Sequence, residues 1–154
     1  MMDVRNDACD GRRQAVALTI AGSDSGGNAG IQADLRAFHV FGVHGCTVLA
    51  ALTAQNPDGV RAILTADAAF VGAQLDAVLD AYAVSALKTG MLSAPEVIDA
   101  VADRLVRYGR IVKVVDPVMV ATSGAKLLQD AAVERLTARL LPLAHLLTPN
   151  LPEA

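Results

Sequence analysis

The chain has 154 residues, of which 53% are hydrophobic and 19% charged, and its formal net charge at pH 7 is −3. A chain this apolar is not intrinsically disordered, because disorder requires low hydrophobicity and high net charge. The slight acidity argues against binding to a nucleic-acid backbone, and three Phe and two Tyr are too few for a base-stacking platform. No run approaches the roughly 18 uninterrupted apolar residues of a membrane span. We therefore expect a cytoplasmic protein that binds neither nucleic acid nor membrane.

Hydrophobic periodicity and turn residues predict strands that alternate with helices. In chain order we expect a strand at 15–21, a loop at 22–30, a helix at 31–41, strands at 46–54 and 60–64, a helix from about 67 to 82, a strand at 84–87, a helix from a start at 93–96 to about 108, a strand at 111–115, a helix at 130–141 and a strand at 145–147. This alternation predicts an α/β fold, in which a mostly parallel sheet carries helices on both faces. Residues 1–14 lack periodicity, so we expect a loose tail there and one folded portion over 15–154.

Residue types at the helix ends predict how several helices begin and end. Gly42 is placed to end the first helix in a left-handed conformation, and Asp67 to cap the start of the second. The sequence Ser-Ala-Pro-Glu at 93–96 matches a capping box for the third helix. In the second helix, Phe70 and Leu75 are expected to face the core.

Polar residues follow several predicted strands, and the ligand crevice of a parallel sheet lies outside the carboxyl ends of its strands. The glycine-rich loop at 22–30 follows the first strand and opens a helix, where backbone N–H groups and the helix dipole favour an anion or a polar ligand. It does not match the dinucleotide fingerprint, because Asp24 stands where glycine is required. It does not match the Walker motif either, because Asn28 and Ala29 replace Lys and Ser or Thr. We expect this loop to contact a ligand, with a plain connector as the alternative.

Five ordered segments carry a resemblance to a known family. They are ALTIAGSDSGGNAGIQADL at 17–35, ALTAQN at 51–56, KTGML at 88–92, VDPVM at 115–119 and LTPNLPEA at 147–154. Together they closely resemble the hydroxymethylpyrimidine/phosphomethylpyrimidine kinases of thiamine biosynthesis, which implies a ribokinase-like three-layer sandwich over about 15–154. One departure is Gly26-Gly27-Asn28, where members usually read Ser-Gly-Gly. We expect the loop shape to survive, because Asn tolerates unusual backbone angles.

The resemblance implies ATP-dependent phosphorylation of 4-amino-5-hydroxymethyl-2-methylpyrimidine and of its monophosphate. Gln55 matches the family's pyrimidine reader, and a Gln amide can answer a ring-nitrogen acceptor and an adjacent amino donor at once. Asp34 matches a carboxylate that contacts the substrate, either at the hydroxymethyl arm or at the amino group. The positions that match the wall of the substrate pocket are Gly22, Ala29, Met91 and Val118.

Three further positions match residues near the nucleotide. Asn150 and Glu153 form the superfamily's Asn-x-x-Glu motif and share one face at the start of a helix. An amide oxygen and a carboxylate suit Mg²⁺, which keeps much of its water and takes few protein ligands. Asp116, at a strand end, matches an acidic position near the phosphates and the metal. The resemblance therefore implies ATP and Mg²⁺ as cofactors, while an ordinary helix start is the alternative interpretation of the Asn/Glu pair.

The family's anion hole, a Gly-Thr-Gly-Cys-like segment that also helps to bind ATP, is not found among these 154 residues. We therefore expect a C-terminally truncated, N-terminal portion of a kinase, with no catalytic residue in this chain and little or no activity unless a partner chain completes it. The alternatives are a pyridoxal-type kinase of the same superfamily and a non-catalytic pyrimidine-binding module. A dinucleotide oxidoreductase is the least favoured, because Asp24 breaks its fingerprint. A homodimer is compatible with the resemblance.

Overall fold

The computed structural model describes residues 14–119, 128, 130–151 and 153, so the tail expected over 1–14 lies outside the description except for Gln14. One six-stranded sheet has the order β3-β2-β1-β4-β5-β6. The strands are β1 (Val16–Asp24), β2 (His44–Asn56), β3 (Gly59–Thr65), β4 (Val84–Thr89), β5 (Val112–Val115) and β6 (Leu146–Leu147). All neighbouring strands are parallel except β2 and β3, which form an antiparallel hairpin at one edge. The predicted mostly parallel sheet is confirmed.

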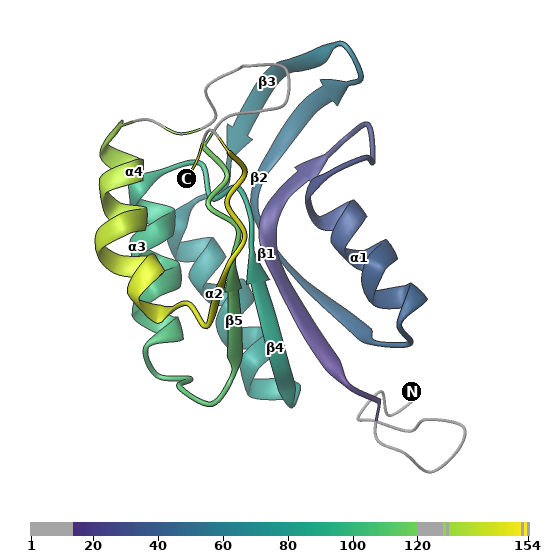
Figure 1. Ribbon diagram of the computed structural model, residues 1–154, viewed down its shortest axis with the longest axis vertical. Coiled ribbons are helices and arrows are strands. Elements are labelled where there is room, and N and C mark those ends of the chain that lie inside the picture. The colour runs from purple at the N-terminus through teal and green to yellow at the C-terminus, as the bar shows by residue number, and fades with distance from the viewer. Residues whose placement is uncertain (1–13, 120–127, 129, 152, 154) are drawn as a thin grey trace.

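Helices cover both faces of this sheet, as predicted. They are α1 (Gly30–Val40), α2 (Ala68–Ala81), α3 (Pro95–Leu105) and α4 (Asp130–Arg135), the last of which continues as a π-helical turn (Leu136–Leu140) and a 3₁₀ turn (Leu141–Leu143). Figure 1 shows α1 on one face and α2, α3 and α4 on the other, so the fold has three layers. In the described part of the chain, no helix is both long and apolar enough to cross a membrane.

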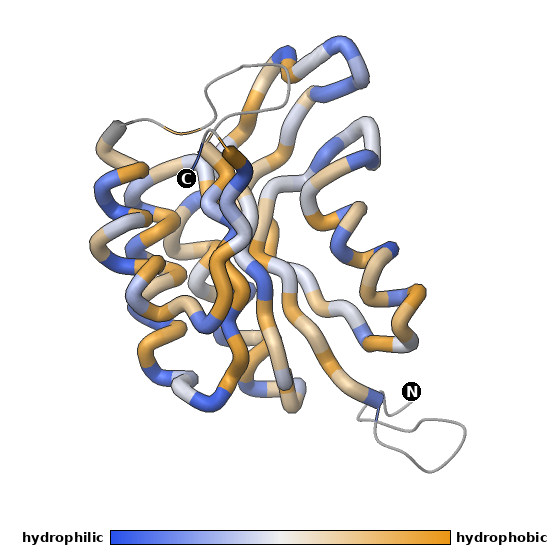
Figure 2. The backbone as a smooth tube through the Cα atoms, in the orientation of Figure 1, coloured by the Kyte–Doolittle hydropathy of each residue, from blue (hydrophilic) through white to orange (hydrophobic). Residues whose placement is uncertain are grey.

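The apolar core lies between the sheet and helices α2 to α4. Leu18 and Ile20 of β1 are fully buried in one cluster with Leu75 of α2 and Ile98 of α3. Burying each such side chain stabilises the fold by roughly 1.5–3 kcal/mol. Because successive residues of a strand point to opposite faces, Thr19 between them points toward α1 instead. In Figure 2 hydrophobic segments run along the central strands, whereas hydrophilic segments gather at turns such as the one that joins β2 and β3.

The two simplest predictions about helix ends are confirmed, and one about the core is wrong. Gly42 follows α1 with a φ of +67°, in the left-handed region. The Asp67 carboxylate caps α2 by accepting a hydrogen bond from the N–H of Phe70 at 3.0 Å. Phe70 itself is 63% exposed, because it lies in the first turn of α2, where Val71 and Leu75 take the inward positions.

The predicted capping box at the start of α3 is also wrong. Ser93 has a φ of +70°, and its hydroxyl lies 2.6 Å from the hydroxyl of Thr65 at the end of β3. The N-cap residue is Ala94, which makes no side-chain hydrogen bond to the helix. A tertiary contact with β3 therefore replaces the local cap. Helix α3 also ends at Leu105, earlier than the expected end near 108.

Candidate active site

A cavity of about 340 Å³ opens at the carboxyl ends of the central strands, in the size range of small-molecule sites. Its walls come from β1, the start of α1, the β2–β3 hairpin, β4 with the residues after it, and the segment after β5. The predicted site residues that line it are Gly22, Ala29, Asp34, Gln55, Met91, Asp116 and Val118. Asn150 and Glu153 are not among the lining residues. The sheet order thus brings together seven of the nine predicted positions, which are spread over 97 residues of sequence from Gly22 to Val118.

The glycine-rich loop after β1 is organised by its own aspartate. The carboxylate of Asp24, which is 4% exposed, accepts hydrogen bonds from the N–H groups of Gly26 at 2.7 Å and of Asn28 and Ala29 at 2.9 Å. These are the N–H groups that a ligand-cradling loop would offer to an anion, and here they are already bonded. The loop therefore contributes to the cavity mainly by forming part of its wall, and not by offering free N–H groups. The Asn28 that departs from the family's usual sequence does not need a left-handed backbone, because the positive φ values of the loop are at Gly27 and Gly30.

Two glycines hold β1 and α1 close enough to shape this wall. Gly30 has a φ of +57°, and a Cβ atom there would lie 2.3 Å from the carbonyl oxygen of Gly22. A Cβ on Gly22 would in turn lie 2.8 Å from Cε of Met91. Gly30 therefore excludes a side chain, because its neighbour is backbone, whereas the missing Cβ of Gly22 leaves room for the end of the Met91 side chain.

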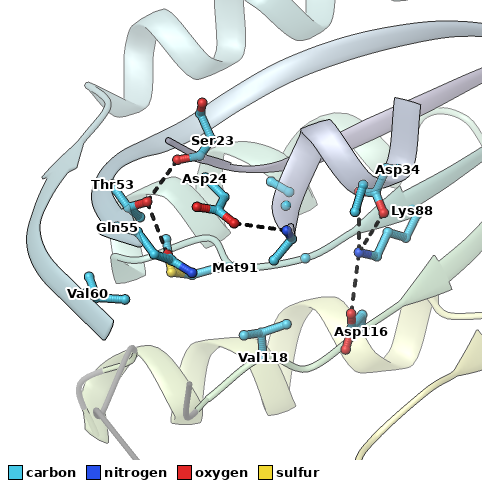
Figure 3. A pocket seen from close by; sticks show the side chains of 16 residues that line it. Ser23, Asp24, Asp34, Thr53, Gln55, Val60, Lys88, Met91, Asp116 and Val118 are labelled. Carbon is cyan, nitrogen blue, oxygen red and sulfur yellow. Dashed lines mark hydrogen bonds and ion pairs between the residues drawn. The ribbon is translucent and has the colours of Figure 1, made fainter. Parts of the chain in front are cut away.

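Gln55 is held at the end of β2 so that its amide reaches the cavity. The hydroxyl of Ser25 donates to the carbonyl oxygen of Gln55 and accepts from its backbone N–H, both at 2.7 Å. The hydroxyl of Thr53 lies 3.2 Å from Oε1 of Gln55 and 3.1 Å from the carbonyl oxygen of Ser23. Figure 3 shows the amide nitrogen of Gln55 directed into the cavity beside Met91. The side chain predicted to recognise a pyrimidine is therefore positioned before any ligand arrives.

A charged cluster lies on the opposite wall. Nζ of Lys88 is 3.1 and 3.3 Å from the two carboxylate oxygens of Asp34 and 3.4 Å from Oδ2 of Asp116. The hydroxyl of Thr19 donates to Oδ2 of Asp34 at 2.6 Å. Burial raises the pKa of Asp116 above its ordinary value; Lys88 acts in the opposite direction, while the charges of Glu153 and Asp34 add to the rise. A cation next to Asp116 would therefore be favoured.

The Asn150/Glu153 pair has the geometry of a helix start. Oδ1 of Asn150 accepts from the N–H of Glu153 at 3.0 Å, and Oε2 of Glu153 accepts from the N–H of Asn150 at 3.1 Å. This reciprocal pair is the arrangement of a capping box. Oε1 of Glu153 also accepts from the N–H of Met119 at 3.1 Å, so the carboxylate ties the segment after β5 to the segment after β6.

Asp116, Asn150 and Glu153 fit Mg²⁺ in donor type, since they offer carboxylate and amide oxygens and each bonded oxygen keeps a second lone pair. Over the described residues, no group of three or more His, Cys, Asp and Glu side chains is close enough to hold a metal ion. These residues therefore suit an ion that takes most of its ligands from water and phosphate.

Sequence reasoning missed Lys88 as a site residue, although it lies in the KTGML segment. Its partners are 54 residues earlier and 28 residues later in the chain, so no local pattern announces the contact. The only signal was its place at the carboxyl end of a predicted strand, which many solvated lysines share. Sequence reasoning also missed Asp24 as the acceptor of the loop N–H groups, because the glycine motifs assign no role to a side chain at that position.

The model of the phosphomethylpyrimidine kinase family matches residues 24–154. The chain belongs to this family. It is 56% identical over 140 residues to the hydroxymethylpyrimidine/phosphomethylpyrimidine kinase of Rhizobium meliloti, an alignment that covers 91% of this chain and 52% of the relative. The chain thus spans about half the length of this curated relative and of the Escherichia coli protein of the same name, to which it is 50% identical. The predicted family is confirmed.

Solved structures agree with the predicted ribokinase-like layers. The phosphomethylpyrimidine kinase of Clostridium difficile 630 superposes with a TM-score of 0.85 at 45% identity, covering 91% of this chain and 61% of that chain. The ADP complex of Bacillus subtilis pyridoxal kinase superposes with a TM-score of 0.81 at 37% identity, covering 91% and 52%. The family fold is therefore shared with a kinase that is named after pyridoxal and not after a pyrimidine.

Proposed function

We propose that this chain forms the pyrimidine-binding side of a kinase that phosphorylates 4-amino-5-hydroxymethyl-2-methylpyrimidine (hydroxymethylpyrimidine) and its monophosphate with ATP, in thiamine biosynthesis. The observation that carries the proposal is that Gln55 and Asp34, from β2 and α1, open into one cavity of suitable size. Membership of the phosphomethylpyrimidine kinase family supports the same reaction class.

Each side chain in the cavity has a role that its chemistry allows. The Gln55 amide carries both a donor and an acceptor, which match the amino group and the neighbouring ring nitrogen of an aminopyrimidine. The Asp34 carboxylate accepts a hydrogen bond, from either the hydroxymethyl arm or the amino group. Met91 and Val118 supply apolar surface for the ring faces, and Gly22 and Ala29 leave room for them.

The phosphate side of the site, which begins at Asp116 in the cavity wall, would receive the nucleotide. Asp116, Asn150 and Glu153 are the residues that would hold Mg²⁺, which when bound offsets the negative charge of the phosphates. Glu153 keeps Asn150 and the backbone of Met119 in place through its own hydrogen bonds. We assign neither a general base nor an anion hole to any residue described here. Because the curated relatives are about twice as long, binding rather than turnover is the appropriate readout for this chain.

Pyridoxal is the second candidate substrate, because the Bacillus subtilis pyridoxal kinase shares the fold at 37% identity. The two rings differ at the edge that Gln55 would read. The ring nitrogen of pyridoxal has no amino group beside it, so a Gln amide cannot use its donor and acceptor together. Gln55 therefore separates the two candidates.

Titration calorimetry of the 154-residue chain with hydroxymethylpyrimidine, pyridoxal and ADP with Mg²⁺ tests the proposal. We expect hydroxymethylpyrimidine to bind more tightly than pyridoxal, and Gln55→Ala to weaken it by about tenfold or more. Gln14→Ala is the matched control, since Gln14 is exposed, lies outside the cavity lining and donates to the carbonyl oxygen of Gly42. Tighter binding of pyridoxal, or equal affinities for wild type and Gln55→Ala, would contradict the proposal. Binding of the pyrimidine without any binding of ADP would favour the non-catalytic module.

A further inference from the structure

Lys88 occupies a central place in the cavity that the roles above do not use. It lies in β4 between Leu87 and Thr89, which are buried in the sheet's other face, so strand alternation turns its side chain toward α1 and the cavity. The described lining contains the carboxylates of Asp24, Asp34 and Asp116, and Lys88 is its only cation.

The contacts of Lys88 join two walls of the cavity. Its ammonium group is within 3.3 Å of both oxygens of Asp34 on α1 and 3.4 Å from Asp116 after β5 (Figure 3). The three side chains are only 15–27% exposed, so water screens these charges less than at an open surface. The backbone also keeps room for the ammonium group, since a Cβ on Gly90 would lie 3.4 Å from Nζ.

We propose that Lys88 is a positioning residue, whose ammonium group holds the Asp34 carboxylate in the orientation that meets the pyrimidine and ties it to Asp116. This inference rests on the proposed function of Asp34. The carboxylate of Asp34 has two fixed partners, Thr19 on β1 and Lys88 on β4, which together fix both its position and its rotation. Without Lys88, Asp34 and Asp116 remain as two partly buried like charges, and repulsion turns them apart.

The alternative role for a lone cation in such a cavity is direct contact with a phosphate of the substrate. The two roles differ in which ligand depends on Lys88. A positioning role affects the neutral alcohol, because it acts through Asp34. A direct phosphate contact affects the monophosphate alone.

Calorimetry of wild type, Lys88→Met, Asp34→Asn and the double variant separates these roles. We expect each single change to weaken binding of hydroxymethylpyrimidine by about tenfold, and the double variant to bind within about threefold of Asp34→Asn. Asp76→Asn, which removes a carboxylate from the Arg104 ion pair between α2 and α3, is the matched control and is expected to bind as wild type does. Losses that multiply in the double variant, or a Lys88→Met effect confined to the monophosphate, would overturn the proposal.

Thermal unfolding of the same proteins tests the charge coupling without any ligand. Asp34→Asn should lower the melting temperature in the wild-type background, where the lost ion pair with Lys88 outweighs the removed repulsion with Asp116. It should raise the melting temperature in the Lys88→Met background, where only the repulsion is left to remove. The same sign in both backgrounds would overturn the coupling. If the wild-type chain binds no pyrimidine, the proposed function fails, and this reversal of sign still decides whether Lys88 holds Asp34.

Discussion

The two sides of the proposed site are built differently. The pyrimidine side, defined as Asp34, Gln55 and Met91, places side chains from α1, β2 and the segment after β4 around an open space. The phosphate side is defined as Asp116, which lines the cavity, and Asn150 and Glu153, which do not. Backbone N–H groups bond to both carboxylate oxygens of Glu153, and burial raises the pKa of Asp116. Under the proposed function, the pyrimidine side is arranged in advance for a neutral ring. The phosphate side carries the carboxylates of Asp116 and Glu153, with Lys88 beside Asp116, and under the same proposal it would take a further cation with the nucleotide.

The wall shared by β1 and α1 is the most sensitive point of the pyrimidine side. Gly30→Ala places a methyl group 2.3 Å from the carbonyl oxygen of Gly22 at a φ of +57°. We expect a loss of about 3 kcal/mol in the free energy of unfolding, measured by chemical denaturation. Gly109→Ala is the control, because a Cβ there meets nothing within 4 Å. Equal stability of the two variants would show that the close approach is not needed.

Asp24 supports the same wall through hydrogen bonds. Asp24→Ala leaves the N–H groups of Gly26, Asn28 and Ala29 without their acceptor, so we expect about 2 kcal/mol of lost stability and weaker pyrimidine binding. Asp58→Ala, in the exposed turn between β2 and β3, should cost less than about 0.5 kcal/mol. If both variants unfold at the same denaturant concentration, the loop does not depend on Asp24.

Glu153→Ala tests whether the two sides are separable. The change removes the acceptor of the Met119 and Asn150 N–H groups, and we expect about 1 kcal/mol of lost stability. Hydroxymethylpyrimidine should still bind within about threefold of wild type, because its proposed partners Gln55 and Asp34 are untouched. A tenfold weaker binding in calorimetry would show that the phosphate side shapes the pyrimidine side.

Replacing Asp116 should change the melting temperature by a small amount that depends on pH. Burial raises the pKa of Asp116, so its charged form costs folding free energy at pH 7, and this cost disappears as pH falls toward the ordinary carboxyl pKa of about 3.9. Asp116→Asn should therefore raise the melting temperature at pH 7, by less than about 3 °C, with a gap that narrows on acidification.

Asp76→Asn should change the melting temperature in the opposite direction. Its side-chain hydrogen bonds with Arg104 lower the pKa of Asp76, so this variant should melt below wild type at pH 7. That gap also closes in acid, as the wild-type carboxyl is protonated. A gap for Asp116→Asn that widens in acid would contradict the assigned cause.

Local signals predicted the elements well because they depend on neighbouring residues. Gly42 and Asp67 act within one helical turn, and both do what their residue types predict. The capping box predicted at Ser93 is absent because the Ser93 hydroxyl bonds to the hydroxyl of Thr65 at the end of β3, a residue distant in the sequence. The same physical limit hid Lys88, whose two carboxylate partners become neighbours only when β4 is placed between β1 and β5.

The most direct measurement is a nitrogen-15 NMR titration of the chain with hydroxymethylpyrimidine that follows side-chain amide signals. Gln55 and Asn150 report separately on the pyrimidine side and the phosphate side of the proposed site. The account predicts that the Gln55 side-chain NH₂ signals shift on binding while those of Asn150 stay in place. Shifts at Asn150 with Gln55 unchanged would contradict it.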